Sequence, residues 1–351
     1  MLMRAVFSLF LLAMSAAVIA AEAPTKLVIA HRGASGYLPE HTLESKVLAY
    51  AQGADYIEQD VVMTKDDQLV VIHDLTLERT TDVAARFPGR ASEDGSYYVI
   101  DFTLEELREL HVGEGSTAGV AQFSARFPPG KSRFGIHTLQ EELELIAGLE
   151  KSHGRRVGIY PELKSPWFHH QRGKDLATAV LRVLKEYGYA TTDAPVYVQS
   201  FDYNELVRVH DEVLPALDMN VKLVQLIAEN EWQETLAKNN DGSWSPYDYQ
   251  WMHTADGLKK LATIVDGIGP SYSMLVKVDH ESTAVDILPM TAAAHAAGLQ
   301  IHPYPFRRDE GQLPAYVDSF DGLLEYFLFT VGVDGVFTDF PDLAVKYLQA
   351  R

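Results

Sequence analysis

The sequence contains no cysteine. This absence excludes disulfide bonds, zinc sites built from thiolates and thiol nucleophiles. It also excludes the lipid-modified cysteine that would tether a bacterial lipoprotein. Any catalysis or metal binding must therefore rely on oxygen and nitrogen groups.

Basic residues are also scarce. The chain has 30 lysines and arginines against 49 aspartates and glutamates, which gives a net charge of −19. No basic run interrupts this acidity, and so acidic a surface repels the phosphate backbone of nucleic acid. Nucleic acid is therefore excluded as a partner. The hydrophobic share of 47% and the charged share of 23% are those of an ordinary folded domain.

Long apolar runs are absent except at the beginning of the chain. In residues 1–21, Arg4 is followed by an uncharged apolar stretch that ends in small residues. This is the layout of a secretory signal peptide, with cleavage expected after Ala20 or Ala21. An uncleaved anchor is disfavoured, because the apolar run is shorter than the ~20 residues that a membrane span needs. We therefore predict an exported chain with no stable membrane anchor after cleavage.

The remainder of the chain, residues 24–351, alternates short β-rich runs with helical stretches. This alternation predicts one domain with a parallel sheet covered by helices. The nine candidate strands are 27–30, 56–63, 69–73, 157–163, 196–201, 221–227, 267–271, 301–304 and 335–338. The helical stretches include 42–51, 139–149, 175–187, 203–213, 255–265 and 285–297.

The third candidate strand cannot be parallel to the second. Only residues 64–68 connect them, whereas a parallel crossover needs a dozen residues or more. Strand 69–73 should therefore fold back as a hairpin partner. Eight strands remain, which is the number in a TIM-type (β/α)8 barrel. We favour this barrel over the alternative, an open doubly wound sheet.

Residues 75–134 interrupt the alternation. They contain three prolines, several glycines and one short helical pattern near 104–110. A purely structureless loop of about 60 residues is improbable in a compact domain. We interpret this segment as a small insertion after the strand hairpin.

Two histidines follow strands at the end where barrel enzymes place their active sites. His31 ends the first strand and is followed by Arg32, whose guanidinium suits phosphate or carboxylate. His73 ends the hairpin strand, and Asp74 either orients it or begins a turn. Breaking a phosphodiester requires one proton to be removed and another to be delivered. His31 and His73 are therefore candidates for an acid–base pair.

Three carboxylates are predicted at the same end. Glu58 and Asp60 alternate along the second strand and so point to one side. Burying them together is costly without a counter-charge, and Glu162 on the fourth run could complete a site for a hard cation. Salt bridges or a solvated edge are the alternative. Oxygen ligands favour Ca²⁺ or Mg²⁺, and Lys164 shares the face of Glu162, where it could meet an anion.

Other polar and aromatic residues are expected on this rim. Aromatic rings there could pack against a polyol or a choline-like group, and an arginine could bind phosphate. The adjacent His169 and His170 diverge in direction, which favours a solvated loop pair over a metal site. The further rim candidates are Gln199 and Phe201, residues 302–304, Arg307 and residues 338–341.

Eight short motifs together carry a family resemblance. They are AHRG at 30–33, PEHT at 39–42, EQDV at 58–61, HD at 73–74, GIYPELK at 158–164, QSF at 199–201, HPY at 302–304 and FTDFP at 337–341. With these motifs, in this order, the chain resembles the bacterial periplasmic glycerophosphodiester phosphodiesterases.

The resemblance implies a TIM-type barrel with a small insertion after the second histidine, located in the periplasm. It implies metal-dependent hydrolysis of deacylated phospholipids, such as glycerophosphocholine and glycerophosphoethanolamine, to sn-glycerol 3-phosphate and an alcohol. Many family members carry asparagine where this chain has His41, so no direct catalytic role is expected for that histidine. The roles implied are divalent-metal ligands, with calcium as the metal, for Glu58, Asp60 and Glu162; acid–base catalysis for His31 and His73; and substrate binding for Arg32, Lys164, Gln199, Phe201 and Arg307.

Two alternative functions stay open at this point. An exported binding protein for glycerophosphodiesters would need the carboxylates and cations, but it would not need two proton-transferring histidines. A related phosphodiesterase acting on intact lipid headgroups would need a membrane-docking surface, and no basic amphipathic helix provides one. For the favoured enzyme, we assign His31 as the base and His73 as the acid. The sequence does not indicate an oligomeric state.

Overall fold

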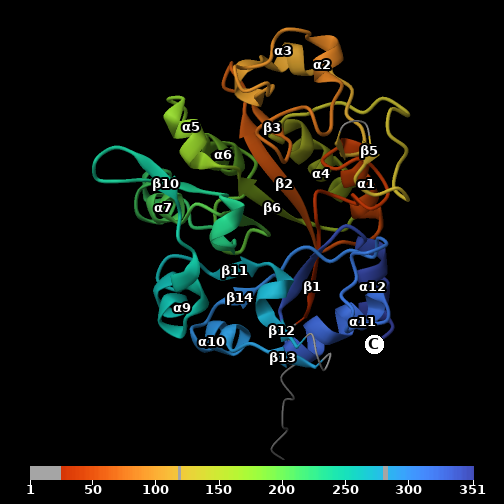
Figure 1. Cartoon of the computed structure of the whole chain (residues 1–351), viewed down its shortest axis with the longest axis vertical. Helices are drawn as coiled ribbons and strands as arrows, with labels where there is room; N and C mark the ends of the chain where they lie inside the picture. Colours follow the sequence, from red (N-terminus) through yellow and green to blue (C-terminus); the bar gives the residue numbers. More distant parts are fainter. Residues whose placement is uncertain (1–24, 118–119, 280–283) are drawn as a thin grey trace, which may run out of the picture.

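The computed structural model describes residues 25–117, 120–279 and 284–351. Eight parallel strands form a barrel with helices around it (Figure 1). Around the barrel the order of the strands is β14-β11-β8-β7-β6-β2-β1-β15. The strands are β1 Leu27–Ala30, β2 Tyr56–Met63, β6 Gly158–Leu163, β7 Tyr197–Ser200, β8 Lys222–Ile227, β11 Gly267–Pro270, β14 Gln300–Ile301 and β15 Gly335–Thr338. The predicted signal peptide, residues 1–21, lies outside the described residues.

The barrel is nearly closed. Strand β14 is short because Pro303 and Pro305 cannot donate to a ladder. Beyond it, the amide of Asp334 donates to the carbonyl of Ile301 (3.0 Å) and that of Phe337 to the carbonyl of Pro303 (3.0 Å). These bonds join the last strand to its neighbour. The predicted (β/α)8 barrel is therefore confirmed, and so is the hairpin, because β3 (Leu69–Val71) pairs antiparallel with β2.

Helices follow the barrel strands and cover the outside of the sheet. The longest, α4, begins with a capping box between Thr138 and Glu141 and ends at the left-handed Gly154. No helix in the described residues combines the length and the apolar character needed to cross a membrane. The outer helices are α1 Leu43–Ala51, α4 Leu139–His153, α6 Leu176–Glu186, α7 Tyr203–Arg208, α9 Ala255–Leu261, α10 Met290–Ala296, α11 Phe320–Glu325 and α12 Pro341–Gln349.

Two predicted helices differ from the structure. The stretch 285–297 is divided into a strand, β13 (Val285–Ile287), and helix α10, because Pro289 precedes the helix and cannot occupy its interior. Strand β13 pairs with β12 (Val276–Val278) in a small hairpin. The stretch 203–213 begins as α7 but continues as a π-helical turn over Val209–Val213, followed by α8 (Leu214–Ala216).

Two excursions extend above the carboxyl ends of the strands. Residues 75–117 and 120–134 form a small apolar core against β2 and β3, and α2 and α3 of this segment lie at the top of Figure 1. The hairpin β9–β10 follows β8, and its Trp244 ring lies 6.3 Å from the ring of Trp167 in α5. The elements of these regions are α2 Val83–Arg86, α3 Leu104–Leu107, β4 Ser116–Thr117, β5 Val120–Ala121, α5 Pro166–Gln171, β9 Leu236–Lys238 and β10 Trp244–Pro246, with 3₁₀ turns at Val99–Asp101, Asn230–Trp232, Gln250–His253 and Tyr272–Leu275.

Large side chains fill the barrel below its polar end. The rings of Tyr160 and Tyr197 stack at 4.9 Å, and Phe337 meets Tyr160 edge-on. The hydroxyl of Tyr160 and the Nδ1 of His302 are 2.9 Å apart. His302 is therefore part of this floor, fully buried, although the sequence predicted it at the rim.

A buried ionic cluster lies between β2 and helices α1 and α4. The Nζ of Lys46 is 3.1 Å from the Oε1 of Glu142, and both side chains are 0% exposed. Glu142 also pairs with His137 (2.7 Å) and accepts from Gln59 (2.8 Å). Lys46 donates to the carbonyl of Glu58. Through this cluster, helix α1 supports the strand that carries two of the predicted metal ligands.

We expect Glu142→Ala to destabilise the protein by about 3–5 kcal/mol, because it leaves the Lys46 ammonium buried without its partner. Chemical denaturation at pH 7 measures this loss. Burial would raise the pKa of Glu142, but the Lys46 charge and the His137 hydrogen bond outweigh it and lower that pKa to about 2. The stabilisation is therefore complete above the unfolded pKa of about 4.3 and is lost as the pH falls toward 2.

The matched control for this prediction is the exposed pair Lys259–Asp256. Removing Asp256 should change the free energy of unfolding by less than about 1 kcal/mol, as is usual for surface pairs. Equal losses from the two variants would show that the buried pair has no special role in stability.

Candidate active site

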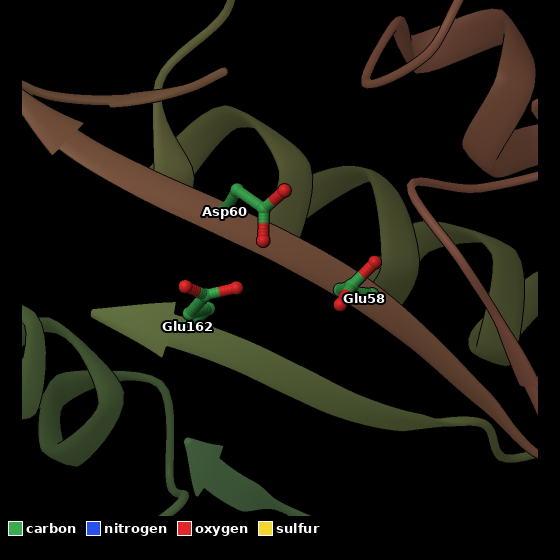
Figure 2. A group of neighbouring side chains, drawn as sticks. All are labelled: Glu58, Asp60 and Glu162. Carbon is green, nitrogen blue, oxygen red and sulfur yellow. The ribbon is translucent and has the colours of Figure 1, made fainter. Parts of the chain in front are cut away.

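The structure brings the three predicted carboxylates together. Glu58 and Asp60 project from β2, and Glu162 projects from β6 on the same side (Figure 2). Asp60 is the register partner of Glu162 in the parallel ladder. One oxygen from each carboxylate lies within 4.8 Å of the others, and all three residues are buried.

The electrostatics of this cluster favour a bound cation. Burial and the neighbouring Asp60 charge raise the pKa of Glu58 to about 8. Burial also raises the pKa of Glu162 well above its usual range, although the Nζ of Lys164 is 2.9 Å away. The Oδ1 of Asp60 is buried and has no hydrogen-bond partner among the described residues. These oxygen donors fit a hard divalent ion, whose charge would keep all three carboxylates ionised.

A left-handed turn after β1 brings the backbone of Arg32 to the carboxylates. Arg32 has a φ of 59° and Gly33 a φ of 88°. A Cβ on Gly33 would lie 2.4 Å from the Oγ of Ser45, so only glycine fits. The left-handed Arg32 is uncommon for a side chain of this kind. In this conformation its amide donates to the Oε2 of Glu58 at 2.8 Å.

Each predicted catalytic histidine is oriented by an aspartate. The Nδ1 of His31 is 2.6 Å from the Oδ1 of Asp339, and the Nδ1 of His73 is 2.5 Å from the Oδ1 of Asp74. Burial would raise the pKa of both aspartates, but other contacts outweigh it. The Arg307 charge lowers the pKa of Asp339, and the hydrogen bond with His73, together with the Arg79 charge, lowers the pKa of Asp74. Ionised carboxylates only accept, so each Nδ1 donates and each Nε2 is available to a ligand.

Both histidines are neutral near pH 7 before an anion binds. Burial lowers the pKa of His31. Burial, together with the charges of Arg32 and Lys164, lowers the pKa of His73 to about 3. The Nε2 of His31 lies 4.0 Å from the Oε2 of Glu58, which places this histidine beside the carboxylate cluster.

The predicted cationic residues pair with carboxylates around the same centre. Arg32 lies 3.1 Å from Glu40 and 3.9 Å from Asp60. The Nε of Arg307 donates to Asp339 at 2.8 Å. Gln199 donates to the Oε1 of Glu58 at 2.9 Å. These contacts connect the predicted substrate-binding residues to the carboxylates and the histidines.

A cavity of about 230 Å³ joins the predicted residues. Every residue with a predicted role in metal binding, acid–base catalysis or substrate binding lines it, except Lys164. Lys164 lies behind the wall, with its Nζ 5.8 Å from the ring of Phe201. The lining residues are His31, Arg32, Glu58, Asp60, His73, Glu162, Gln199, Phe201, Leu226, Trp232, Glu234, Tyr304, Pro305, Arg307 and Phe337.

Contacts explain two other histidines, His41 and His169. The Nε2 of His41 is 2.7 Å from the Oδ2 of Asp60, so it holds one of the clustered carboxylates in place. The prediction of a solvated loop pair at His169 and His170 is wrong, because both lie in helix α5 and His169 is buried. The Nε2 of His169 accepts from the amide of Met63, and its Nδ1 donates to the carbonyl of Ser165. With both nitrogens used, His169 is not a metal ligand.

Several site residues had no signal in the sequence. Arg126, in the insertion, donates to Asp339 and also pairs with Asp309 at 2.6 Å. Trp232 and Glu234 enter the cavity wall from the connection between β8 and β9. No strand pattern or motif marks these positions, because irregular segments carry them to the site.

Comparison with known proteins matches the chain to one family. The model of the glycerophosphoryl diester phosphodiesterase family matches residues 31–343. The chain is 49% identical to a glycerophosphodiester phosphodiesterase of Haemophilus influenzae over 92% of this chain and 90% of that protein. It is 45% identical to one of Treponema pallidum over 95% of this chain and 94% of that protein.

Solved structures share the fold. An Oleispira antarctica phosphodiesterase in complex with the product sn-glycerol-3-phosphate has a TM-score of 0.58 and 24% identity, covering 93% of this chain and 97% of its own. A glycerophosphodiester phosphodiesterase of Agrobacterium tumefaciens has a TM-score of 0.53 and 21% identity, covering 92% and 99%. At these identities the comparison shows a shared fold alone.

Proposed function

The chain belongs to the glycerophosphoryl diester phosphodiesterase family, and from this membership we propose that it hydrolyses glycerophosphodiesters to sn-glycerol 3-phosphate and an alcohol. Glycerophosphocholine and glycerophosphoethanolamine are the proposed substrates. The observation that carries the proposal is the convergence of three buried carboxylates and two aspartate-oriented histidines on one cavity.

Glu58, Asp60 and Glu162 are the proposed ligands of a divalent ion. We propose calcium, with magnesium as the alternative, because all three donors are carboxylates. When bound, the ion supplies positive charge that offsets the negative charge developing on the phosphoryl oxygens. His41 and Gln199 hold two of these carboxylates in position, through hydrogen bonds to Asp60 and Glu58.

The two histidines are proposed to move the protons. The Nε2 of His31 takes a proton from the glycerol hydroxyl next to the phosphate, and that oxygen attacks phosphorus. His73 gives a proton to the departing alcohol oxygen as its bond to phosphorus breaks. A neutral imidazole cannot give a proton. His73 must therefore gain its proton once the anionic phosphodiester is bound, because a nearby negative charge raises the pKa of an imidazole.

This route forms a cyclic phosphate, which water opens in a second step with the roles of the histidines exchanged. Detecting the cyclic phosphate by phosphorus NMR during turnover would support it. In the alternative, His31 deprotonates a water that attacks directly. A single-step reaction with inversion at a chiral phosphorus would establish that alternative.

The cations and aromatic groups are proposed to bind the substrate. Arg32 and Arg307 line the cavity beside the histidines and suit the phosphate oxygens. Lys164 acts from behind by neutralising Glu162. Phe201 provides an apolar wall for the glycerol carbons.

We also propose that the protein acts in the periplasm after removal of residues 1–21. Sequencing the N-terminus of the exported protein tests this. A new terminus after Ala20 or Ala21 is expected, and an intact Met1 would contradict export with cleavage.

A coupled assay for released glycerol 3-phosphate tests the proposed reaction. With glycerophosphocholine as substrate, we expect turnover that a chelator abolishes and added calcium restores, with magnesium less effective. Binding of glycerophosphocholine without product would favour the binding-protein alternative. Release of headgroup from intact phospholipid, with none from glycerophosphocholine, would favour the lipid phosphodiesterase.

A further inference from the structure

A second cavity, of about 190 Å³, opens beside the first. His31, Arg32, His73 and Arg307 line both cavities, so the two meet at the histidine pair. A phosphodiester has an alcohol on each side of its phosphate. If the phosphate lies at the shared wall, each alcohol faces a different cavity. The clustered carboxylates line only the first, which leaves the second to the other alcohol.

The insertion contributes part of the wall of this second cavity. Each of the four arginines that line the cavity has a carboxylate partner, which offsets part of its positive charge. The pairs are Arg32 with Glu40, Arg79 with Glu40 and Asp74, Arg126 with Asp309 and Asp339, and Arg307 with Asp339. The insertion residues on the wall are Arg79, Glu114, Gln122, Phe123 and Arg126.

Glu114 is the exception to this pairing. It lines the cavity and is only 7% exposed, yet its carboxylate makes no hydrogen bond or ion pair with any residue in the described ranges. Burial raises its pKa to about 7, with Arg126 opposing and Glu40 reinforcing the shift. A buried carboxylate without a partner is costly, and a cationic ligand would supply the missing partner.

Two neighbours of Glu114 are already in contact with other groups of the protein. A Cβ on Gly115 would lie 2.7 Å from the Nη1 of Arg79, so the chain passes close to that arginine. The ring of Phe123 is covered by the guanidinium of Arg126 at 3.9 Å. That ring face is therefore occupied, and recognition rests on the charge of Glu114.

We propose that the second cavity is a subsite for the leaving alcohol and that Glu114 selects alcohols carrying an ammonium or quaternary ammonium group. The inference rests on the proposed phosphodiesterase function. It makes Glu114 a specificity-determining residue contributed by the insertion, and it assigns the insertion a role in substrate choice.

The test compares Glu114→Gln with the wild type on three substrates. Glycerophosphocholine and glycerophosphoethanolamine carry cationic alcohols, and glycerophosphoglycerol carries a neutral one. The ratio of kcat/KM for each cationic substrate to that for the neutral one should fall at least about tenfold in the variant. Glu114→Asp keeps the charge and should retain part of the preference.

Glu109→Gln is the matched control, because Glu109 belongs to the same insertion but is exposed. It should leave the ratio unchanged. An unchanged ratio in Glu114→Gln, or an equal loss on all three substrates, would overturn the subsite while leaving the enzyme a phosphodiesterase. Failure of the wild type to release glycerol 3-phosphate from any of them would instead contradict the proposed function.

Discussion

The Glu162→Gln variant is expected to turn over glycerophosphocholine at least about 10³-fold more slowly than the wild type while staying folded. Its amide oxygen is neutral, so the site loses one of three charged ligands and the ion binds more weakly. Stabilisation of transition-state charge by a bound ion is worth several kcal/mol, and each 1.36 kcal/mol is about tenfold in rate. The coupled assay at saturating substrate, with calcium varied, measures the loss.

Thermal unfolding separates loss of the ion from loss of the fold. Without metal, the three carboxylates lie within 4.8 Å of one another, and burial raises the pKa of Glu162 well above its usual range. Removing the Glu162 charge relieves this repulsion, which offsets the lost pairing with Lys164, so the chelated variant should stay close to the wild type in stability. The wild type should gain stability with calcium, because a ligand bound only by the native state raises its Tm, and the variant should gain little.

Glu231→Gln is the matched control, since this exposed glutamate lies beyond the cavity wall. It should keep both the activity and the calcium-induced rise in Tm. A Glu162→Gln variant with wild-type turnover, or with the full calcium response, would show that the cluster is not the metal site.

The carboxylate cluster could be predicted because it follows from two regular features of strands. Alternation along a strand places Glu58 and Asp60 on one face. Parallel pairing then places Glu162 beside Asp60 once β6 is known to be the neighbour of β2. The count of strands and the short link after β2 supplied that adjacency, so local pattern and topology were sufficient.

The depth at which a side chain lies inside the barrel could not be predicted from the sequence in this way. His302 and Tyr304 are two positions apart and both face inward, yet His302 packs in the floor while Tyr304 reaches the cavity. The stagger between strands sets this depth, and it depends on the tilt of the whole sheet. A motif therefore shows which face a side chain takes but not which layer.

The polar groups that the insertion contributes to the site were harder still to predict. Arg126 donates to Asp339, although the two residues are 213 positions apart in the sequence and Arg126 lies in an insertion without regular periodicity. Glu114 likewise lies in an irregular segment of the insertion. Hydrophobic periodicity predicts helices and strands with one buried face. It does not predict polar contacts made by loops.

Replacing His31 or His73 by alanine should each lower turnover by at least about 100-fold, because a positioned proton-transfer group contributes about 10²–10⁴-fold. Neither change should unfold the protein, since each imidazole borders the cavity and is not packed inside the core. The coupled assay measures the loss, and circular dichroism checks the fold. His210→Ala, at an exposed position on the helix after β7, is the control and should stay fully active.

The choice of leaving group should distinguish the two histidines. A diester that releases p-nitrophenolate needs little protonation of its leaving oxygen, so it relieves the need for an acid but not for a base. His73→Ala should recover much of its rate on such a substrate, whereas His31→Ala should not. The opposite pattern would exchange the two roles, and a double variant with wild-type activity would remove both histidines from the mechanism. Because both act on one substrate, the double variant should lose less than the product of the single losses.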